Sequence, residues 1–295
     1  MIKSRWSVAL GSLVGILALL LLLAGCEGPQ GLQGPQGSAG PQGPAGQKGD
    51  AGPVPSESQL KALIAEQLRG APATVSSIAR GGRLYDSWAK EAKATVPAGN
   101  QSLWALQTTN TRTGADTWRC KECHGWDYKG KGGAYSKGSH LTGFVGVYDA
   151  GTTKSQQQIL EILKGATDSR HDFSKLLDAQ SLNELSAFLS QSLINETPYI
   201  DYATKKPIGA DVARGKTRYD GTCAACHGAN GKQLNFGDAA APEYVGTLAA
   251  DNPWEFMHKV RYGQPGASMP SGLVTNWSIQ DVADVLAYSQ TLPAK

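Results

Sequence analysis

Hydrophobic and polar positions follow one helical pattern in two segments that lie far apart in the chain. The segment 181–189 runs SLxxLxxFL and the segment 278–286 runs SIxxVxxVL, so their apolar positions match one for one. Apolar residues spaced three and four positions apart fall on one face of an α-helix. The pattern predicts two amphipathic helices that hold equivalent places in two similar parts of the chain.

Other segments extend this internal repeat. The sequence ARGGRLYD at 79–86 is repeated as ARGKTRYD at 213–220. Each copy is expected to form a helix that leads toward one of the two cysteine-containing segments. Helices are also expected at 155–164 and 252–262, each of which is followed directly by glycine, the residue that most often ends a helix. A mainly α-helical protein built from two similar parts is therefore expected.

An apolar run at 8–25 follows two basic residues and ends at Cys26. This order is typical of an export signal, although about 18 apolar residues also approach the length that spans a bilayer. The residues LAGC at 23–26 resemble the lipobox of bacterial lipoproteins, where the signal is cut and the cysteine is acylated. The resemblance implies a signal peptide over 1–25, a lipid on Cys26 and a place in the cell envelope. Glu27, where aspartate would favour the inner membrane, points to the outer membrane.

Residues 28–54 consist of nine Gly-X-Y triplets, the repeat that a collagen triple helix requires. A capped amphipathic helix is expected next, at 56–70. These segments indicate either a trimeric stalk, which would make the protein a homotrimer, or a monomeric extended spacer. The lipid anchor and collagen-like repeat are assigned to 26–55, and the short helix and linker to 56–74.

Four of the five cysteines lie in two copies of the pattern C-x-x-C-H, at 120–124 and 223–227. This spacing is the attachment signature of c-type haem, with Cys120, Cys123, Cys223 and Cys226 as the bonded thiols. A four-cysteine zinc site, two disulfides or redox-active cysteine pairs are the alternatives. None of them explains the histidine that directly follows each pair, so two covalently bound haem c groups are predicted.

The repeat, the two motifs and the final helices together resemble two monohaem cytochrome c domains in tandem. The resemblance covers about 75–295 and implies a first domain at 75–197, a linker at 198–208 and a second domain at 209–295. It also implies that His124 and His227 bind the irons from one side. The first domain carries an insertion at about 87–118, rich in threonine, alanine and asparagine, whose tryptophans could cover a haem edge, form a docking surface or pack internally.

The resemblance implies a methionine before a proline as the distal iron ligand of the second domain. Met269 fits, because Pro270 follows it and it stands six residues after the glycine that ends the helix 252–262. Met257 and His258 are competitors, but both lie inside that helix, where packing is the commoner role.

The first domain departs from this pattern, because no methionine occurs between Met1 and Met257. His171 stands six residues after the glycine that ends the helix 155–164, which is the offset of Met269 in the second domain. His171 is therefore the predicted distal ligand, with His140 as the rival and an open or otherwise ligated iron as the third possibility.

Charge changes the functional picture little. The formal net charge is +3, which is too small to indicate a nucleic-acid-binding protein, and haem propionates would reduce it further. Methionine opposite histidine raises a haem's reduction potential relative to a second histidine. The sequence predicts a membrane-tethered dihaem cytochrome that relays electrons to redox partner proteins of the envelope, a carrier rather than an enzyme. The alternative is a dihaem oxidoreductase, similar to peroxidases or sulfur-compound dehydrogenases, that uses the first haem as its active site.

Overall fold

The structure is a computed structural model that describes residues 56–57 and 73–295. The predicted signal peptide, Cys26 and the collagen-like triplets lie outside these residues, as does all of the expected helix 56–70 beyond its first two positions. The described residues belong to one compact unit.

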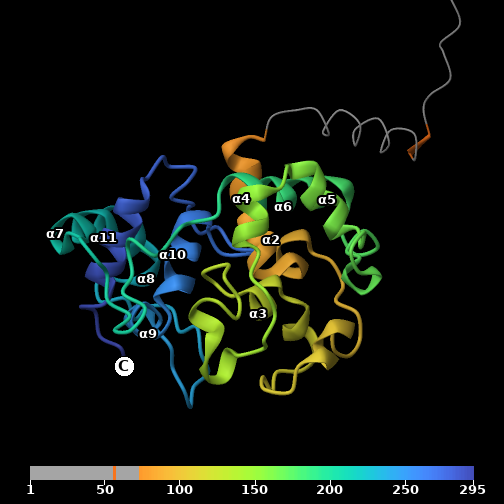
Figure 1. Cartoon of the computed structure of the whole chain (residues 1–295). Coiled ribbons are helices and arrows are strands. Elements are labelled where there is room, and N and C mark those ends of the chain that lie inside the picture. The colour runs from red at the N-terminus through yellow and green to blue at the C-terminus, as the bar shows by residue number, and fades with distance from the viewer. Residues whose placement is uncertain (1–55, 58–72) are drawn as a thin grey trace, which may run out of the picture. The chain divides into compact units, whose positions relative to one another are not determined.

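The described residues are mainly helical, as the sequence predicts, and they contain isolated bridges but no β-strand (Figure 1). The longer helices are α2 (Val75–Ala92), α5 (Gln156–Leu163), α6 (Ala179–Gln191), α10 (Pro253–Tyr262) and α11 (Ile279–Ser289). The shorter helices are α3 (Cys120–His124), α4 (Tyr148–Thr153), α7 (Val212–Arg218), α8 (Ala224–His227) and α9 (Val245–Asp251). Within this part of the chain, no helix combines the length and apolar character needed to cross a bilayer.

The four helices predicted from apolar spacing are confirmed as α5, α6, α10 and α11, and their ends follow from capping chemistry. Ser155 caps α5 and Ser278 caps α11, each by accepting a hydrogen bond from the backbone N–H three residues on. In both cases the side chain at that third position returns a hydrogen bond to the cap, which completes a capping box. The α10 helix stops at Gly263, whose φ of 93° favours glycine.

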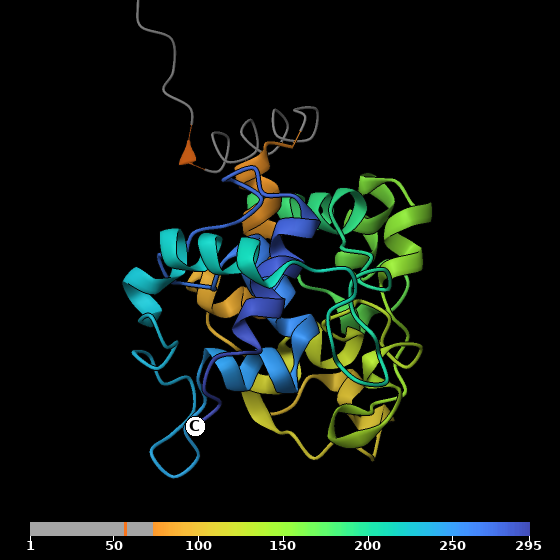
Figure 2. The ribbon, with the colours of Figure 1, turned by 90° about the vertical axis from the view of Figure 1, so that its left-hand side faces the viewer.

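The two copies of Ala-Arg-Gly make the same kind of helix contact. Gly81 lies where α2 meets α6, and a Cβ at this position would overlap the carbonyl oxygen of Glu184. Gly215 lies where α7 meets α11, and a Cβ there would overlap the carbonyl oxygen of Asp284. Figures 1 and 2 show α2 against α6 and α7 against α11. The repeated glycine lets the first and last helices of each half touch backbone to backbone.

Charged and hydroxyl groups repeat alongside these glycines. Arg80 pairs with Glu184 across α2 and α6, and Arg214 pairs with Asp284 across α7 and α11. The Tyr85 hydroxyl donates to the carbonyl of Gly125 at 2.6 Å, and the Tyr219 hydroxyl donates to the carbonyl of Gly228 at 2.9 Å. Both acceptor glycines directly follow a C-x-x-C-H motif. Each half therefore fixes its motif against its first helix through an equivalent tyrosine.

His258 joins the two halves rather than binding a cofactor. It is fully buried in α10, its Nε2–H donates to the carbonyl of Gly82 at 2.9 Å, and its Nδ1 accepts from the Tyr128 hydroxyl at 2.7 Å. Burial lowers the pKa of His258 to about 4, so the ring is neutral. Both ring nitrogens are used, which agrees with the packing role expected for a histidine inside this helix.

The insertion 87–118 contributes mainly core packing. Trp88, at the end of α2, is 1% exposed, and its indole N–H donates to the carbonyl of Trp118 at 2.7 Å. Trp104, in the turn η1 (Ser102–Leu106), is also buried and donates to the carbonyl of Arg112 at 3.0 Å. Each donor N–H of these buried indoles is satisfied, as stable burial requires. The insertion therefore packs internally, and its turn η2 (Gly114–Trp118) contacts α3.

Candidate functional site

Each C-x-x-C-H motif lies at a short helix, α3 in the first half and α8 in the second. Both helices end at a glycine with nearly the same backbone, φ 79° and ψ 158° at Gly125 and φ 78° and ψ 156° at Gly228. A φ of this sign is easily reached only by glycine. Because these angles match, the backbone turns in the same way after each motif.

The four cysteines of these motifs form no disulfide with one another in the structure. In the described part of the chain, no group of three or more His, Cys, Asp or Glu side chains converges as a metal site. Burial raises the pKa of the Cys120 thiol to about 12 and that of Cys223 to about 11. Redox-active cysteine pairs instead need a lowered thiol pKa. These observations do not favour the zinc, disulfide and redox-pair alternatives.

His124 is oriented by a backbone carbonyl. Its Nδ1 lies 2.7 Å from the carbonyl oxygen of Val145, so Nδ1–H donates and Nε2 is left as the free ligating nitrogen. Burial, with a smaller contribution from the nearby His171, lowers the pKa of His124 to about 4. A neutral imidazole with one nitrogen fixed by a hydrogen bond is the form that binds a metal.

His171 faces His124 in the structure. It ends the turn η5 (Ser169–His171), and the two imidazole ring centroids are 6.2 Å apart with an angle of 78° between the ring planes. A metal bound to one nitrogen of each ring at about 2 Å would separate the ring centroids by roughly 6 Å, once the nitrogen-to-centre distance of each ring is added. The residues present therefore fit a single iron between the two histidines.

The segment that carries His171 is held from both sides. Asp168 caps the turn η5 through a hydrogen bond from the Arg170 backbone, and the backbone of Phe173 donates to the carbonyl of Leu163 in α5 at 2.9 Å. The buried ring of Phe173 lies 5.1 Å from that of His171. Burial lowers the pKa of His171, which again favours the neutral ring.

His140, the rival ligand of the first half, belongs to a different group of side chains. Its ring stacks on Tyr135 at 4.6 Å with an interplanar angle of 18°, and its Nδ1 lies 3.3 Å from a guanidinium nitrogen of Arg112. Burial first, and the Arg112 charge second, lower the pKa of His140 to about 4. Its Nδ1 accepts from Arg112 there, so the geometry favours His171 as the residue opposite His124.

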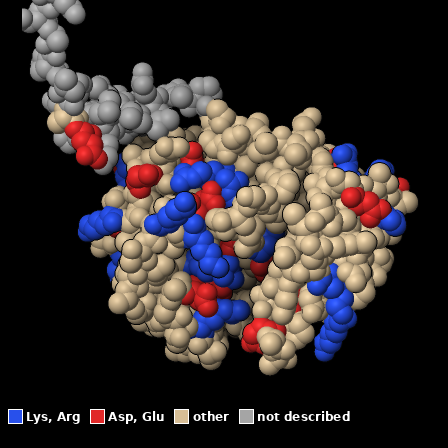
Figure 3. All heavy atoms as spheres, turned by 180° about the vertical axis from the view of Figure 1, so that it is seen from behind, with Lys and Arg blue, Asp and Glu red and all other residues tan. Residues whose placement is uncertain are grey.

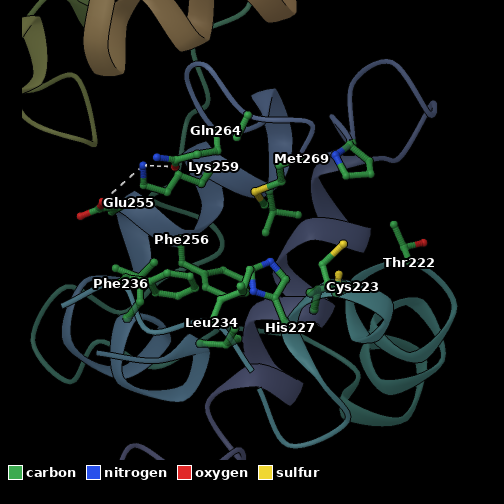
Figure 4. Close-up of a pocket in the computed structure, with 18 of the residues that line it drawn as sticks. Thr222, Cys223, His227, Leu234, Phe236, Glu255, Phe256, Lys259, Gln264 and Met269 are labelled. Carbon is green, nitrogen blue, oxygen red and sulfur yellow. Dashed lines mark hydrogen bonds and ion pairs between the residues drawn. The ribbon is translucent and has the colours of Figure 1, made fainter. Parts of the chain in front are cut away.

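The second half contains a pocket of about 640 Å³. Pockets that hold small organic ligands measure about 300–1,000 Å³. Its lining includes Cys223, Cys226, His227, Phe256, Met269 and Trp277. Figure 4 shows His227 and Met269 between the Cys223 end of the pocket and an opposite end that carries both Lys259 and Phe236. The motif and the predicted methionine thus share one largely apolar cavity that fits a haem.

The loop that carries Met269 is anchored to α10. The backbone of Gly272 donates to the carbonyl of Val260, and that of Leu273 donates to the carbonyl of Arg261, both at 2.9 Å. Met257, the competing methionine, is fully buried within α10 and does not line the pocket. The structure brings Met269, rather than Met257, to the cavity of His227.

His227 differs from His124 in its hydrogen bonding. Its Nδ1 is buried without a hydrogen-bond partner in the described residues, and the centroids of the His227 and Phe236 rings are 5.7 Å apart. Burial lowers the pKa of His227. A ligand histidine whose second nitrogen does not donate is a weaker electron donor to its metal. The two halves therefore differ in the hydrogen bonding of the motif histidine and in the side chain that lies near it, His171 in one and Met269 in the other.

One cluster near these sites was missed by the sequence analysis. Asp86, 1% exposed, pairs with Arg119 and with Lys259. The internal repeat does not predict this cluster, because Asp220, the counterpart of Asp86, instead pairs with Lys216 on an exposed helix surface. Lys259 is four residues from Glu255 on α10, and only the packing of α10 against α2 brings it to Asp86.

Comparison with known families addresses the second half. Residues 210–288 match the family model described as "Cytochrome C oxidase, cbb3-type, subunit III". These matched residues include the second C-x-x-C-H motif and Met269, and the match supports covalently bound haem c and haem-based electron transfer. No curated protein matched the chain significantly.

Proposed function

We propose that this protein is a dihaem c-type cytochrome that relays electrons in the cell envelope. The observation that carries the proposal is the His124–His171 pair, whose ring centroids stand 6.2 Å apart at the first C-x-x-C-H motif. The repeated glycine contacts, ion pairs and tyrosine hydrogen bonds support two cytochrome c domains in tandem. The match of residues 210–288 supports the haem chemistry of the second half.

The residues of each site have distinct tasks in this proposal. Cys120 and Cys123 would hold the first haem, with His124 and His171 as axial ligands, and Cys223 and Cys226 would hold the second, with His227 and Met269. Haem supplies a one-electron couple that does not require a change of ligand. Two strong axial ligands suit outer-sphere electron transfer better than substrate chemistry.

The axial ligands also set the direction of transfer. Methionine raises the potential relative to histidine, and the unpaired Nδ1 of His227 acts in the same direction, because it donates less charge than the hydrogen-bonded His124. The first haem would therefore be the low-potential donor and the second the high-potential acceptor. An enzyme with the first haem as its active site would require His171 to leave the iron.

Mass spectrometry of the purified holoprotein tests the haem count. The proposal requires the mass of two haems, and a C120S/C123S variant should retain only one. A wild-type mass with a single haem would contradict the dihaem assignment. Peroxide or thiosulfate turnover well above background, together with a high-spin first haem, would instead support the oxidoreductase alternative.

We also propose that a lipid on Cys26 tethers the body to a membrane and that residues 28–54 extend it away from the lipid surface. The lipobox-like residues 23–26 and the Gly-X-Y triplets support this arrangement. Mass analysis of the N-terminal peptide from membranes should reveal acylated Cys26, and a C26S variant should lose the lipid. Sedimentation of the delipidated protein distinguishes a trimeric stalk from a monomeric spacer.

A further inference from the structure

The pocket of the second motif is completed by the first half of the chain. Besides residues of the segment 210–288, its lining includes Lys90, near the end of α2, and Arg119. Arg119 is the residue directly before Cys120, the first cysteine of the other motif. A residue in the wall of the second pocket is therefore the sequence neighbour of Cys120, the first predicted haem-attachment cysteine.

Buried Asp86 fixes the positions of two cations on this wall. Arg119 donates to a carboxylate oxygen of Asp86 and, through its Nε, to the Asp86 backbone carbonyl at 2.9 Å. Lys259 donates to the other carboxylate oxygen at 2.6 Å. Burial alone would raise the pKa of Asp86, but the charges of Lys259 and Arg119 outweigh it and lower that pKa to about 2. One buried carboxylate thus orients two cations, and these three residues together carry one positive charge, while Glu255 lies 3.6 Å from Lys259.

One of these two cations, Lys259, also meets the first motif through Trp126. The indole is fully buried, with the ammonium of Lys259 5.2 Å and that of Lys121 5.1 Å from its ring centre. Lys121 lies inside the first C-x-x-C-H motif, whereas Lys259 lines the second pocket. From behind, charged side chains of both signs crowd beside a hollow in the surface (Figure 3). The charge cluster therefore lies between the two sites.

The ends of the second pocket differ in chemistry. Figure 4 shows Cys223 and Thr222 at one end, and at the other the polar side chains of Lys259, Gln264 and Glu255 above the apolar ring of Phe236. Haem c carries its two thioether bonds on one edge and its two propionates on the opposite edge. A haem bonded to Cys223 and Cys226 would direct its propionates toward Lys259 and the neighbouring Arg119.

We propose that Arg119 and Lys259, held by Asp86, form a carboxylate-binding site for the propionates of the second haem and link its potential to that of the first. The proposal rests on the proposed dihaem function. Lys90 supplies a third cation at the same pocket, while Glu255 and Glu243 are the acidic groups that also line it. The positive charges favour the reduced haem, which carries one positive charge fewer than the oxidised haem.

Asp86 is the positioning residue of this site, and the effects of Arg119 and Lys259 on the two potentials can be measured separately. In a potentiometric titration of the holoprotein, Lys259→Gln should lower the midpoint of the methionine-ligated haem by about 59 mV, the equivalent of a tenfold change in a one-electron equilibrium constant. The first haem should shift less. Arg119→Gln should lower both midpoints, because Arg119 touches the second pocket and adjoins Cys120, and Arg119→Lys should restore most of the loss.

Arg214→Gln is the matched control, because Arg214 also pairs with a buried carboxylate, Asp284, but does not line the pocket. It should leave both midpoints unchanged. Lys90→Gln removes an exposed cation, so it tests the same site without disturbing the core, and it should lower the second midpoint by a smaller amount.

The outcomes separate this inference from the function on which it rests. Variants that keep both haems and both ligand spectra, yet shift neither midpoint more than Arg214→Gln does, would overturn the carboxylate site and leave the dihaem cytochrome standing. If Lys259→Gln or Arg119→Gln does not fold, Lys90→Gln replaces it. A second-haem midpoint that Lys90→Gln lowers no more than Arg214→Gln does would then overturn the carboxylate site. A wild-type protein without a second haem would overturn both proposals.

Discussion

The imidazoles of His124 and His171 face each other at 6.2 Å between ring centroids, although the two residues are 47 positions apart in the chain. One side chain comes from the helix α3 and the other from the turn after α5. Substituting His171 should therefore change the first haem alone. His171→Ala should convert it from low-spin to high-spin, visible by electron paramagnetic resonance, and His171→Met should raise its midpoint by on the order of 100 mV, within the roughly 0.8 V range that axial ligands span.

His140→Ala is the control for this prediction. Because His140 stacks on Tyr135 in a separate group, its loss should leave the spin state and midpoint of the first haem unchanged. A high-spin signal from His140→Ala, with His171→Ala unaffected, would reverse the assignment of the two histidines.

The second axial prediction concerns Met269. Its replacement by leucine should abolish the far-red absorption band of methionine sulfur bound to ferric haem and should lower the midpoint of the second haem or leave its iron high-spin. Met257→Leu, a volume-conserving change in the buried part of α10, should cost less than about 1.5 kcal/mol of stability and keep the band. Loss of the band in Met257→Leu alone would assign the ligand to Met257.

Apolar spacing and glycine stops predicted the helices α5, α6, α10 and α11 because these signals are local. The same logic placed His171 and Met269 at equal offsets from a helix-ending glycine, and the structure brings His171 to face His124 and Met269 to the pocket of His227. Local sequence patterns are enough to predict the features that the two halves share.

The sequence could not predict the contacts between the halves. Asp86, Arg119 and Lys259 come from three separate segments, and nothing in their neighbours signals that α10 packs on α2. The repeat was misleading here, since Asp220, at the position equivalent to Asp86, is exposed and paired within its own helical segment. Burial of His258 against Tyr128 likewise depends on tertiary packing.

The buried ion cluster gives a pH prediction for stability. The native pKa of Asp86 is about 2, below its unfolded value near 4, so its contribution is present above about pH 4 and is lost as the pH falls toward 2. A shift of this size corresponds to about 2 kcal/mol. Asp86→Asn should destabilise the protein at pH 7 by roughly 3–5 kcal/mol, because it leaves Arg119 and Lys259 without their buried partner.

Urea unfolding of wild type and Asp86→Asn between pH 2 and pH 7 measures this effect. The difference in unfolding free energy should shrink as the pH falls below 4. A difference that stays constant over that range would show that the charge of Asp86 is not its source.

Glu196 should behave in the opposite way. Its carboxylate is fully buried without a hydrogen-bond partner in the described residues, and burial, reinforced by the charge of Asp127 and opposed by that of Lys129, raises its pKa well above the usual value. The native state therefore holds a proton that the unfolded state releases, and stability falls as the pH rises from about 4.5, the unfolded value, toward the raised native pKa. Glu196→Gln should stabilise the protein at neutral pH by about 1 kcal/mol or more and flatten this pH dependence.

Thermal unfolding at pH 5 and pH 8 checks the Glu196 prediction. Glu161→Gln, on the exposed face of α5, is the control and should change stability by less than about 0.5 kcal/mol at either pH. A Glu196→Gln variant that is less stable than wild type at pH 8 would mean that the ionised carboxylate is satisfied in the folded protein.

Two differently ligated haems are most directly tested by a redox titration of the wild-type holoprotein, followed by both absorption and electron paramagnetic resonance. Two one-electron waves are expected, the lower from a low-spin haem without the methionine band and the higher from the haem that carries it. A single wave, or a high-spin first haem in the oxidised protein, would contradict the pairing of His124 with His171 and the relay built on it.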